Sequence, residues 1–207
     1  MNTFFNITLI TLLSLSQLFA RSFNDPQIME AESIKTVYIK LNGVIIIENS
    51  LDNKVHIKTT SKVDGKIIGF SNNEDLSAYR VETFMDEKDL TIKPAKRESR
   101  WTVGINTVSE ENTHIIRIPK DKNVVINSSD ANININGRYA LLKINNREGE
   151  TEITALENDI RYLTCRSANG EIWFNGKEQE ESYMNILPGN AVIDVNSYRG
   201  IIKMYVK

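Results

Sequence analysis

Short β-branched runs alternate with polar turns along almost the whole chain after Arg21. Runs such as Val37–Leu41, Val44–Glu48 and His114–Ile118 are separated by Asn, Asp and Gly. Apolar and polar residues alternate within each run, which is the period of a half-buried strand rather than that of a helix. The pattern therefore predicts an all-β protein.

The strand-like runs of the second half recur with a regular spacing. When every second run is taken, the inward-facing residues fall into two columns. The first column holds Ile135, Ala155, Phe174 and Val195, and the second holds Ile144, Cys165, Ile186 and Val206. A two-strand unit that repeats about every 20 residues is typical of a solenoid.

Glycines recur at the corners of these units, at Gly149, Gly170 and Gly189. The predicted fold is a flattened single-chain parallel β-helix (solenoid) of about 20 residues per coil. Its repeats span residues 120–207, and a less regular β region over residues 34–119 continues or caps it. Asn-Gly pairs such as Asn175-Gly176 also suit hairpin turns, so an antiparallel meander or sandwich remains open.

The segment Met1–Ala20 is uncharged and mostly apolar. It fits a secretory signal peptide that is cleaved after Ala20, with an uncleaved anchor or a buried helix as the alternative. Residues 21–33 then form a linker. We expect an extracytoplasmic protein, whether periplasmic, secreted or on the cell surface, with no transmembrane segment after removal of the signal peptide.

Charge and composition narrow the classes of function. The 25 basic and 27 acidic side chains give a net charge of −2, which argues against nucleic-acid binding. One Cys excludes a disulfide framework, and two His leave little for a metal site. The common motifs of hydrolases and nucleotide-binding enzymes are absent, so we expect neither a cofactor nor a metal.

Aromatic residues suggest a binding surface. In the predicted solenoid, Leu141, Tyr162 and Tyr183 form an outward stripe on consecutive coils, which either a partner or another part of the chain covers. Trp173 and Asp194 lie in a second outward column and are further candidate contacts for a surface protein or a glycan.

Two carboxylates provide an alternative function. Glu152 and Glu171 would stand on adjacent coils about 5 Å apart, the separation of a retaining glycosidase pair. The alternative is therefore a carbohydrate-active enzyme on a β-helix scaffold, whereas a solvated face with two acids is the simpler interpretation.

Short motifs carry a family resemblance. They comprise Gly43–Ile47, Asp52–Lys58, Asp89–Ile92 and Ile116–Pro119, followed by repeats that end in Asn136-Gly137, Glu148-Gly149 and Asn169-Gly170. The sequence resembles the putative-adhesin family of exported bacterial proteins built from β-strand repeats. The resemblance implies a β-helix outside the cytoplasm and no agreed catalytic residues.

These observations predict an exported, non-enzymatic β-helix protein that serves as an adhesin-like binding module or a cell-envelope scaffold. The last strand-like run, Gly200–Lys207, would form the end coil with an open edge. Such an edge allows either self-association through strand pairing or the addition of a strand from a partner.

Overall fold

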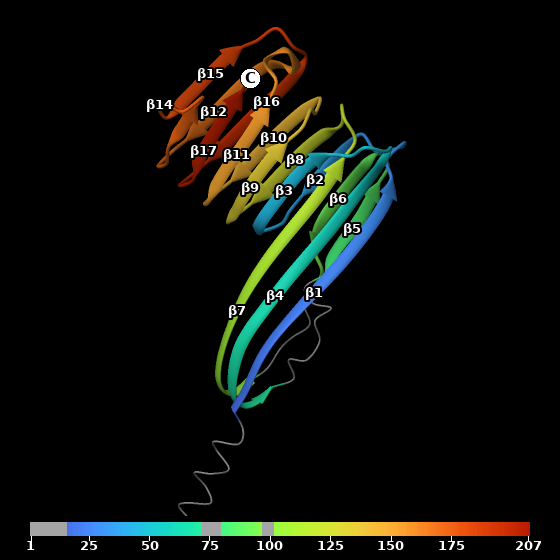
Figure 1. Cartoon of the computed structure of the whole chain (residues 1–207), viewed down its shortest axis with the longest axis vertical. Helices are drawn as coiled ribbons and strands as arrows, with labels where there is room; N and C mark the ends of the chain where they lie inside the picture. The colour runs from blue at the N-terminus through green and yellow to red at the C-terminus, as the bar shows by residue number, and fades with distance from the viewer. Residues whose placement is uncertain (1–15, 72–79, 97–101) are drawn as a thin grey trace, which may run out of the picture.

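The computed structural model describes residues 16–71, 80–96 and 102–207 (Figure 1). The strands form two mixed sheets that face each other. Sheet A has nine strands in the order β1 (Ser16–Glu30), β4 (Lys54–Ser71), β7 (Thr102–Ile118), β3 (Gly43–Asn49), β9 (Ala131–Asn136), β11 (Glu150–Ala155), β17 (Ile201–Val206), β13 (Ile172–Phe174) and β14 (Lys177–Gln179). Sheet B has eight strands in the order β15 (Ser182–Ile186), β12 (Ile160–Ser167), β16 (Ala191–Ser197), β10 (Leu141–Asn146), β8 (Asn123–Ser128), β2 (Thr36–Ile39), β6 (Asp89–Pro94) and β5 (Val81–Asp86). A 3-10 turn at Glu157–Asp159 precedes β12.

The predicted all-β class is confirmed, and part of the predicted repeat is present. The chain passes from β8 in sheet B to β9 in sheet A, then to β10 and β11, and each strand pairs in parallel with the strand one unit away. Asn127 and Asn145 are 18 residues apart and lie side by side in this register. Over these strands the chain alternates between the two sheets, and each unit stacks in parallel on the one before it.

The order of the later strands differs from the prediction. The β16–β17 unit comes last in the chain, yet β16 lies between β10 and β12, and β17 lies between β11 and β13. Phe174 is therefore in sheet A and Val195 in sheet B. The prediction that these two residues share one column is wrong, and the sequential 20-residue β-helix is not the observed topology.

A hairpin explains the change of order. Asn175 and Gly176 have φ angles of 48° and 76°. Two successive positive φ values are characteristic of a type I′ turn, which reverses the strand direction. Consequently β14 is antiparallel to β13, and β15 is antiparallel to β12. The chain then returns through β16 and β17 into the gap between units already formed.

The two regions expected from the sequence, residues 34–119 and 120–207, share the same sheets. Strand β2 pairs with β8, and β3 pairs with β9. Strand β17, expected as an open edge, lies inside sheet A. Its neighbours on both sides satisfy its backbone, so it offers no edge for self-association.

Three long antiparallel strands, β1, β4 and β7, extend beyond the two-layer part of the molecule (Figure 1). Strand β1 occupies residues 21–30, where the sequence suggested a linker. Residues 16–20 of the expected signal peptide pair through their backbone with residues 64–68 of β4. Residues 1–15, which hold the rest of that segment, lie outside the described residues.

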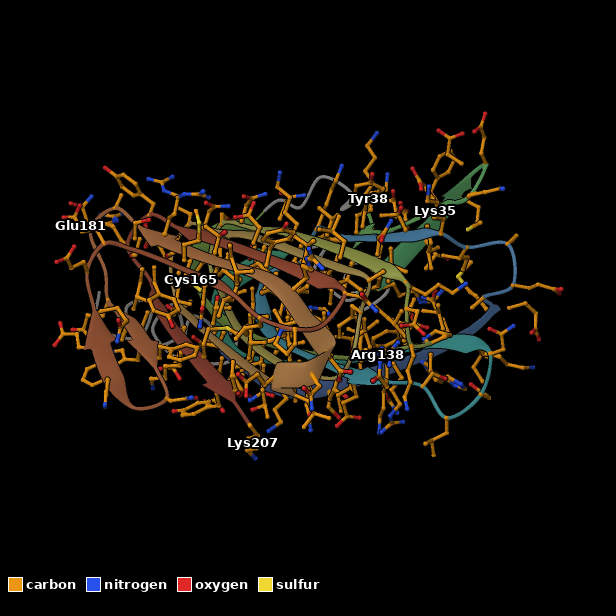
Figure 2. The ribbon with its side chains drawn as sticks, turned by 90° about the horizontal axis from the view of Figure 1, so that it is seen from above. Lys35, Tyr38, Arg138, Cys165, Glu181 and Lys207 are labelled. Atoms are coloured by element: carbon orange, nitrogen blue, oxygen red, sulfur yellow. The ribbon has the colours of Figure 1, made fainter. Side chains whose placement is uncertain are left out.

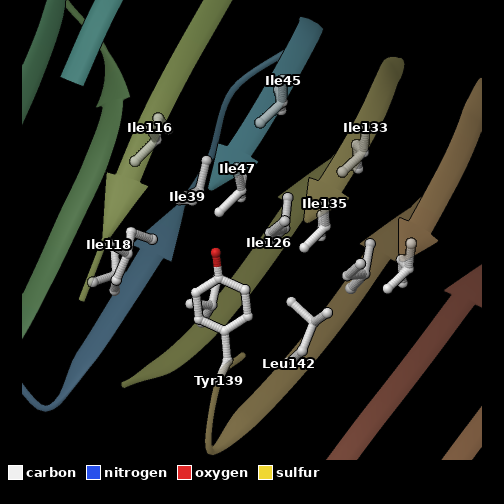
Figure 3. Packing of buried hydrophobic residues seen from close by; sticks show 14 of the residues in the cluster. Ile39, Ile45, Ile47, Ile116, Ile118, Ile126, Ile133, Ile135, Tyr139 and Leu142 are labelled. Atoms are coloured by element: carbon white, nitrogen blue, oxygen red, sulfur yellow. The ribbon is translucent and has the colours of Figure 1, made fainter. Parts of the chain in front are cut away.

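Rows of β-branched side chains fill the space between the sheets (Figure 3). One row of sheet A contains Ile116, Ile47, Ile135 and Ile153, all at most 1% exposed. Each buried side chain of this size contributes about 1.5–3 kcal/mol relative to an exposed one. These rows hold the two layers together and turn the alternate residues outward.

Glycines allow the corners of neighbouring units to approach closely. A Cβ on Gly149 would lie 2.3 Å from the carbonyl oxygen of Ala131, and one on Gly200 would lie 2.3 Å from that of Gly149. Gly170 approaches Gly200 in the same way. One corner of the fold therefore stacks three glycines, Gly149, Gly200 and Gly170. Gly189, which the sequence placed at the same kind of corner, packs against Asp159 and is not part of this stack.

Candidate functional site

An apolar strip crosses the outer face of sheet B. It consists of Leu141, Val192, Tyr162 and Ile186, which lie in register on β10, β16, β12 and β15. Ile186 is 67% exposed and Tyr162 is 45% exposed, while Leu141 and Val192 are half-buried. Four apolar side chains in one row, two of them exposed, form a surface suited to a partner.

The strip widens at the edge strand β15. Met184, two residues before Ile186, is 66% exposed on the same face. The guanidinium of Arg161 lies 5.6 Å from the centre of the Tyr162 ring. The widest part of the strip therefore combines the apolar side chains of Ile186 and Met184 with the ring of Tyr162, over which the guanidinium of Arg161 lies.

A polar ladder runs parallel to the strip on the same face. Asn145 donates to Asn127 (2.9 Å), Asn196 donates to Asn145 (3.4 Å), and Arg166 donates to Asn196 (3.3 Å). Arg166 also pairs with Asp194 at 3.1 Å. The apolar strip is thus bordered by amides and one ion pair, which is the composition of a binding surface with a polar rim.

Tyr183 does not belong to this face, contrary to the prediction. It lies opposite Cys165 across the antiparallel β12–β15 pair and packs against the core. Its ring stacks on Phe174 with 4.7 Å between ring centres. Burial raises the pKa of its hydroxyl. In the antiparallel register of β12 and β15, Ile186 takes the outward position beside Tyr162.

The other predicted contacts are divided between the two sheets. Asp194 lies on β16 of sheet B, and Trp173 lies on β13 of sheet A, where its indole N–H donates to Glu171 at 2.9 Å. Among the five predicted binding residues, only Leu141, Tyr162 and Asp194 share a face. Asp194 belongs to the polar border of the strip, and Trp173 belongs to a different surface.

The carboxylate pair of the enzyme hypothesis is not brought together. Strand β17 separates β11, which carries Glu152, from β13, which follows Glu171. Two strand spacings place their backbones about 10 Å apart. Lys203 stands beside Glu152 in register and donates to Glu150 at 2.8 Å, and this bond raises the pKa of Lys203. The expected 5 Å separation is wrong.

The two histidines of the chain, His56 and His114, have local structural partners. His56 lies 2.8 Å from Asp52, whose pKa is lowered to about 2 by hydrogen bonds from Ser50 and His56. His114 is buried, and burial lowers its pKa to about 4. Its Nδ1 lies 3.0 Å from the hydroxyl of Thr59. Within the described residues, no group of three His, Cys, Asp or Glu side chains could hold a metal ion.

Cys165 lies between the sheets, as the sequence suggested (Figure 2). Burial raises the pKa of its thiol to about 12. A thiol in this state is a poor nucleophile, because the thiolate is the reactive form.

In the described part of the chain, no helix has the length and apolar character needed to cross a membrane.

Val192, Ile186 and Met184 are the site residues that sequence reasoning missed. The repeat spacing places Met184 and Ile186 inward, but Tyr183 and Leu187, which are out of phase with them, pack against the core instead. The run has apolar residues in both phases, so alternation alone does not decide which set faces inward. The Asn175-Gly176 pair predicts a hairpin, and with it the reversed direction of β15, but not the face of Ile186.

Comparison with known proteins identifies one family. The family described as Toastrack DUF4097 matches residues 44–204. No curated protein matches the sequence. A solved structure described as a putative cell adhesion protein from Clostridium sporogenes is 14% identical, with a TM-score of 0.45, over 90% of this chain and 100% of that one. Another, described as a putative adhesin from Bacteroides fragilis, is 11% identical, with a TM-score of 0.26, over 92% of this chain and 97% of that one.

Proposed function

The chain belongs to the Toastrack DUF4097 family, and we propose that it is an exported, non-enzymatic protein that binds a partner through the apolar strip of sheet B. The function is that of an adhesin-like binding module or a cell-envelope scaffold. The observation that carries the proposal is the row of four apolar side chains, with Ile186 67% and Tyr162 45% exposed.

The construction of the strip supports contact with a macromolecule. It lies on the flat outer face of a sheet, and the core residues between the sheets fix each strand beneath it. A rigid surface loses little conformational freedom on binding. Tyr162 and Met184 resemble the residues that are enriched at protein interfaces, and the bordering amides suit either a protein or a glycan.

Location outside the cytoplasm is part of the proposal and rests on the uncharged, apolar segment Met1–Ala20. Sequencing the N-terminus of the protein recovered from outside the cytoplasm tests it. We expect the recovered chain to begin at Arg21. Recovery only from the cytoplasm, with Met1 retained, would contradict export.

Binding is tested with a strip variant and a matched control. Tyr162→Ser combined with Ile186→Ser removes the two most exposed members of the strip. Ile28→Ser combined with Phe84→Ser removes an aliphatic and an aromatic side chain that are 63% and 59% exposed elsewhere. Both double variants lose similar apolar surface, and all four sites are exposed, so neither should unfold the protein.

Fluorescently labelled protein is titrated onto envelope fractions of the source organism. We expect the strip variant to bind about tenfold more weakly, because each lost contact contributes about 1 kcal/mol or less. The control should bind as the wild type does. Protease and periodate treatment of the fractions separate a protein partner from a glycan. Equal binding by the strip variant and the wild type refutes the assignment of the strip.

A further inference from the structure

Strand β15 forms one edge of sheet B, and among the described residues only β12 pairs with it (Figure 1). At the two ends of this pair, the N–H of Ser167 donates to Glu181 and the N–H of Leu187 donates to Arg161. Because hydrogen-bonded pairs alternate along an antiparallel ladder, these bonds turn the odd-numbered residues of β15 towards β12. The backbone groups that point outward from the edge are therefore those of Ser182, Met184 and Ile186.

This edge has no charged residue and no proline among Ser182–Ile186. Sheets commonly prevent pairing at their edges with charged side chains or proline. The other edge strands of the described sheets carry such residues, namely Glu82 and Asp86 on β5, Pro26 on β1, and Lys177 and Glu178 on β14. Strand β15 is thus the edge best suited to accept another strand.

The sequence of β15 is complementary to a second copy of itself. When two β15 strands pair antiparallel about a twofold axis at Met184, the two Met184 residues face each other, and Ser182 lies opposite Ile186 of the second copy. Each outward-pointing residue then meets an outward-pointing residue of the other strand. One outward donor, the N–H of Ile186, already bonds to Oδ1 of Asn185 at 2.9 Å, and this side chain turns away when the strands pair.

The charges at the two ends of β15 fit the same register. Glu181, which directly precedes the strand and lies at one end of the molecule, would stand opposite Leu187 of the second copy (Figure 2). Leu187 has Arg161 beside it on β12. The acidic end of each strand therefore approaches the basic end of the other, and the two acidic ends stay apart.

We propose that β15 pairs antiparallel with β15 of a second copy, so that sheet B continues from one subunit into the other. The twofold axis is perpendicular to the sheet, which places the outer faces of both subunits on the same side. The dimer consequently presents two apolar strips on one face, and two linked sites bind a surface more tightly than one. The pairing itself does not depend on the partner of the strip, so either proposal can fail alone.

Sedimentation equilibrium of the purified protein alone measures the dimer, over a dilution series that reaches about 1 mM. We expect the mass to rise to twice that of the monomer. Met184→Lys puts two like charges opposite each other at the axis and should weaken dimerisation roughly tenfold. Phe84→Lys is the matched control, because Phe84 is 59% exposed on β5 at the opposite edge of sheet B, and it should leave dimerisation unchanged.

Single cysteines test the register. Met184 and Ile186 are 66% and 67% exposed, so random collisions would cross-link cysteines at both positions equally. In the proposed dimer the two copies of position 184 have Cα atoms about 5.5 Å apart, within reach of a disulfide, whereas the two copies of position 186 are about 14 Å apart. Mild oxidation should therefore cross-link Met184→Cys and not Ile186→Cys, while Cys165 is buried and stays reduced.

Three results would overturn the proposal. The first is a protein that stays monomeric over the whole dilution series, which would leave the edge to a strand of another protein. The second is equal weakening of the dimer by Met184→Lys and Phe84→Lys. The third is cross-linking of Ile186→Cys that equals or exceeds that of Met184→Cys.

Discussion

Three glycines allow the close packing of neighbouring units to be separated from backbone conformation. Gly176 has a φ of +76° and no atom within 4 Å of an added Cβ. At Gly200, where no left-handed φ is present, an added Cβ would lie 2.3 Å from the carbonyl oxygen of Gly149. Gly149 combines a φ of +94° with a Cβ position 2.3 Å from the carbonyl oxygen of Ala131. Alanine at the three positions therefore tests conformation alone, contact alone and both together.

The expected losses follow from these geometries. Gly176→Ala costs about 1 kcal/mol, the penalty of a left-handed conformation for a residue with a Cβ. Gly200→Ala costs roughly 2–3 kcal/mol, because the new methyl group meets backbone atoms that cannot rotate away. Gly149→Ala suffers both effects and should lose about 3–5 kcal/mol. For a chain of this size, 1 kcal/mol corresponds to about 2–4 °C in Tm.

Urea denaturation followed by circular dichroism gives the free energy of unfolding for each variant. The m-value should stay constant, so that a change in midpoint reports stability alone. We expect the order of loss Gly149→Ala, then Gly200→Ala, then Gly176→Ala. If Gly200→Ala were as stable as the wild type, β17 would not approach β11 at this corner, and the reasoning would be refuted.

Three further predictions concern buried groups. The pKa of His114 is about 4 in the folded protein against about 6.5 when exposed, so the unfolded state binds more protons between these values. The free energy of unfolding is therefore undiminished by this group above pH 6.5 and falls by about 3 kcal/mol as the pH drops towards 4. Urea titrations should show this loss in the wild type and a smaller loss in His114→Gln. Equal losses in the two proteins would contradict the assignment. Cys165 should resist a thiol reagent at pH 8 until the protein unfolds, and rapid native labelling followed by mass spectrometry would show that the thiol is accessible. Ile47→Ala should lose about 2–5 kcal/mol in the same denaturation assay, whereas Ile28→Ala at an exposed site should lose less than about 0.5 kcal/mol; similar losses would contradict the burial of Ile47.

Local pairing was predictable from the sequence because it depends on short-range patterns. Alternation identified the strands, and the 18-residue relation between Asn127 and Asn145 came close to the expected repeat. Buried positions such as Ile144 and Cys165 followed from the same alternation, since a side-chain period of two fixes the face of each strand. These properties do not depend on which units become neighbours.

The order of units was not predictable in the same way. A strand such as β17 presents the same inward pattern whether it joins the end of a sheet or fills a gap within it. After the hairpin at Asn175-Gly176, the strands are no longer added to the sheets in the order of the sequence, and β17 pairs with both β11 and β13. The face of β15 was not predictable either, because its run has apolar residues in both phases: Tyr183 faces inward, and Ile186 stands outward beside Tyr162.

The interleaved position of β17 is tested most directly by disulfide cross-linking. Glu152→Cys with Lys203→Cys joins residues in register on adjacent strands, whereas Glu152→Cys with Glu171→Cys joins residues separated by β17. A disulfide requires Cα atoms about 4.4–6.8 Å apart, which one strand spacing provides and two do not. Mass spectrometry after mild oxidation should find the bond in the first double variant and not in the second. A bond between positions 152 and 171, with none between 152 and 203, would contradict the strand order on which the whole account depends.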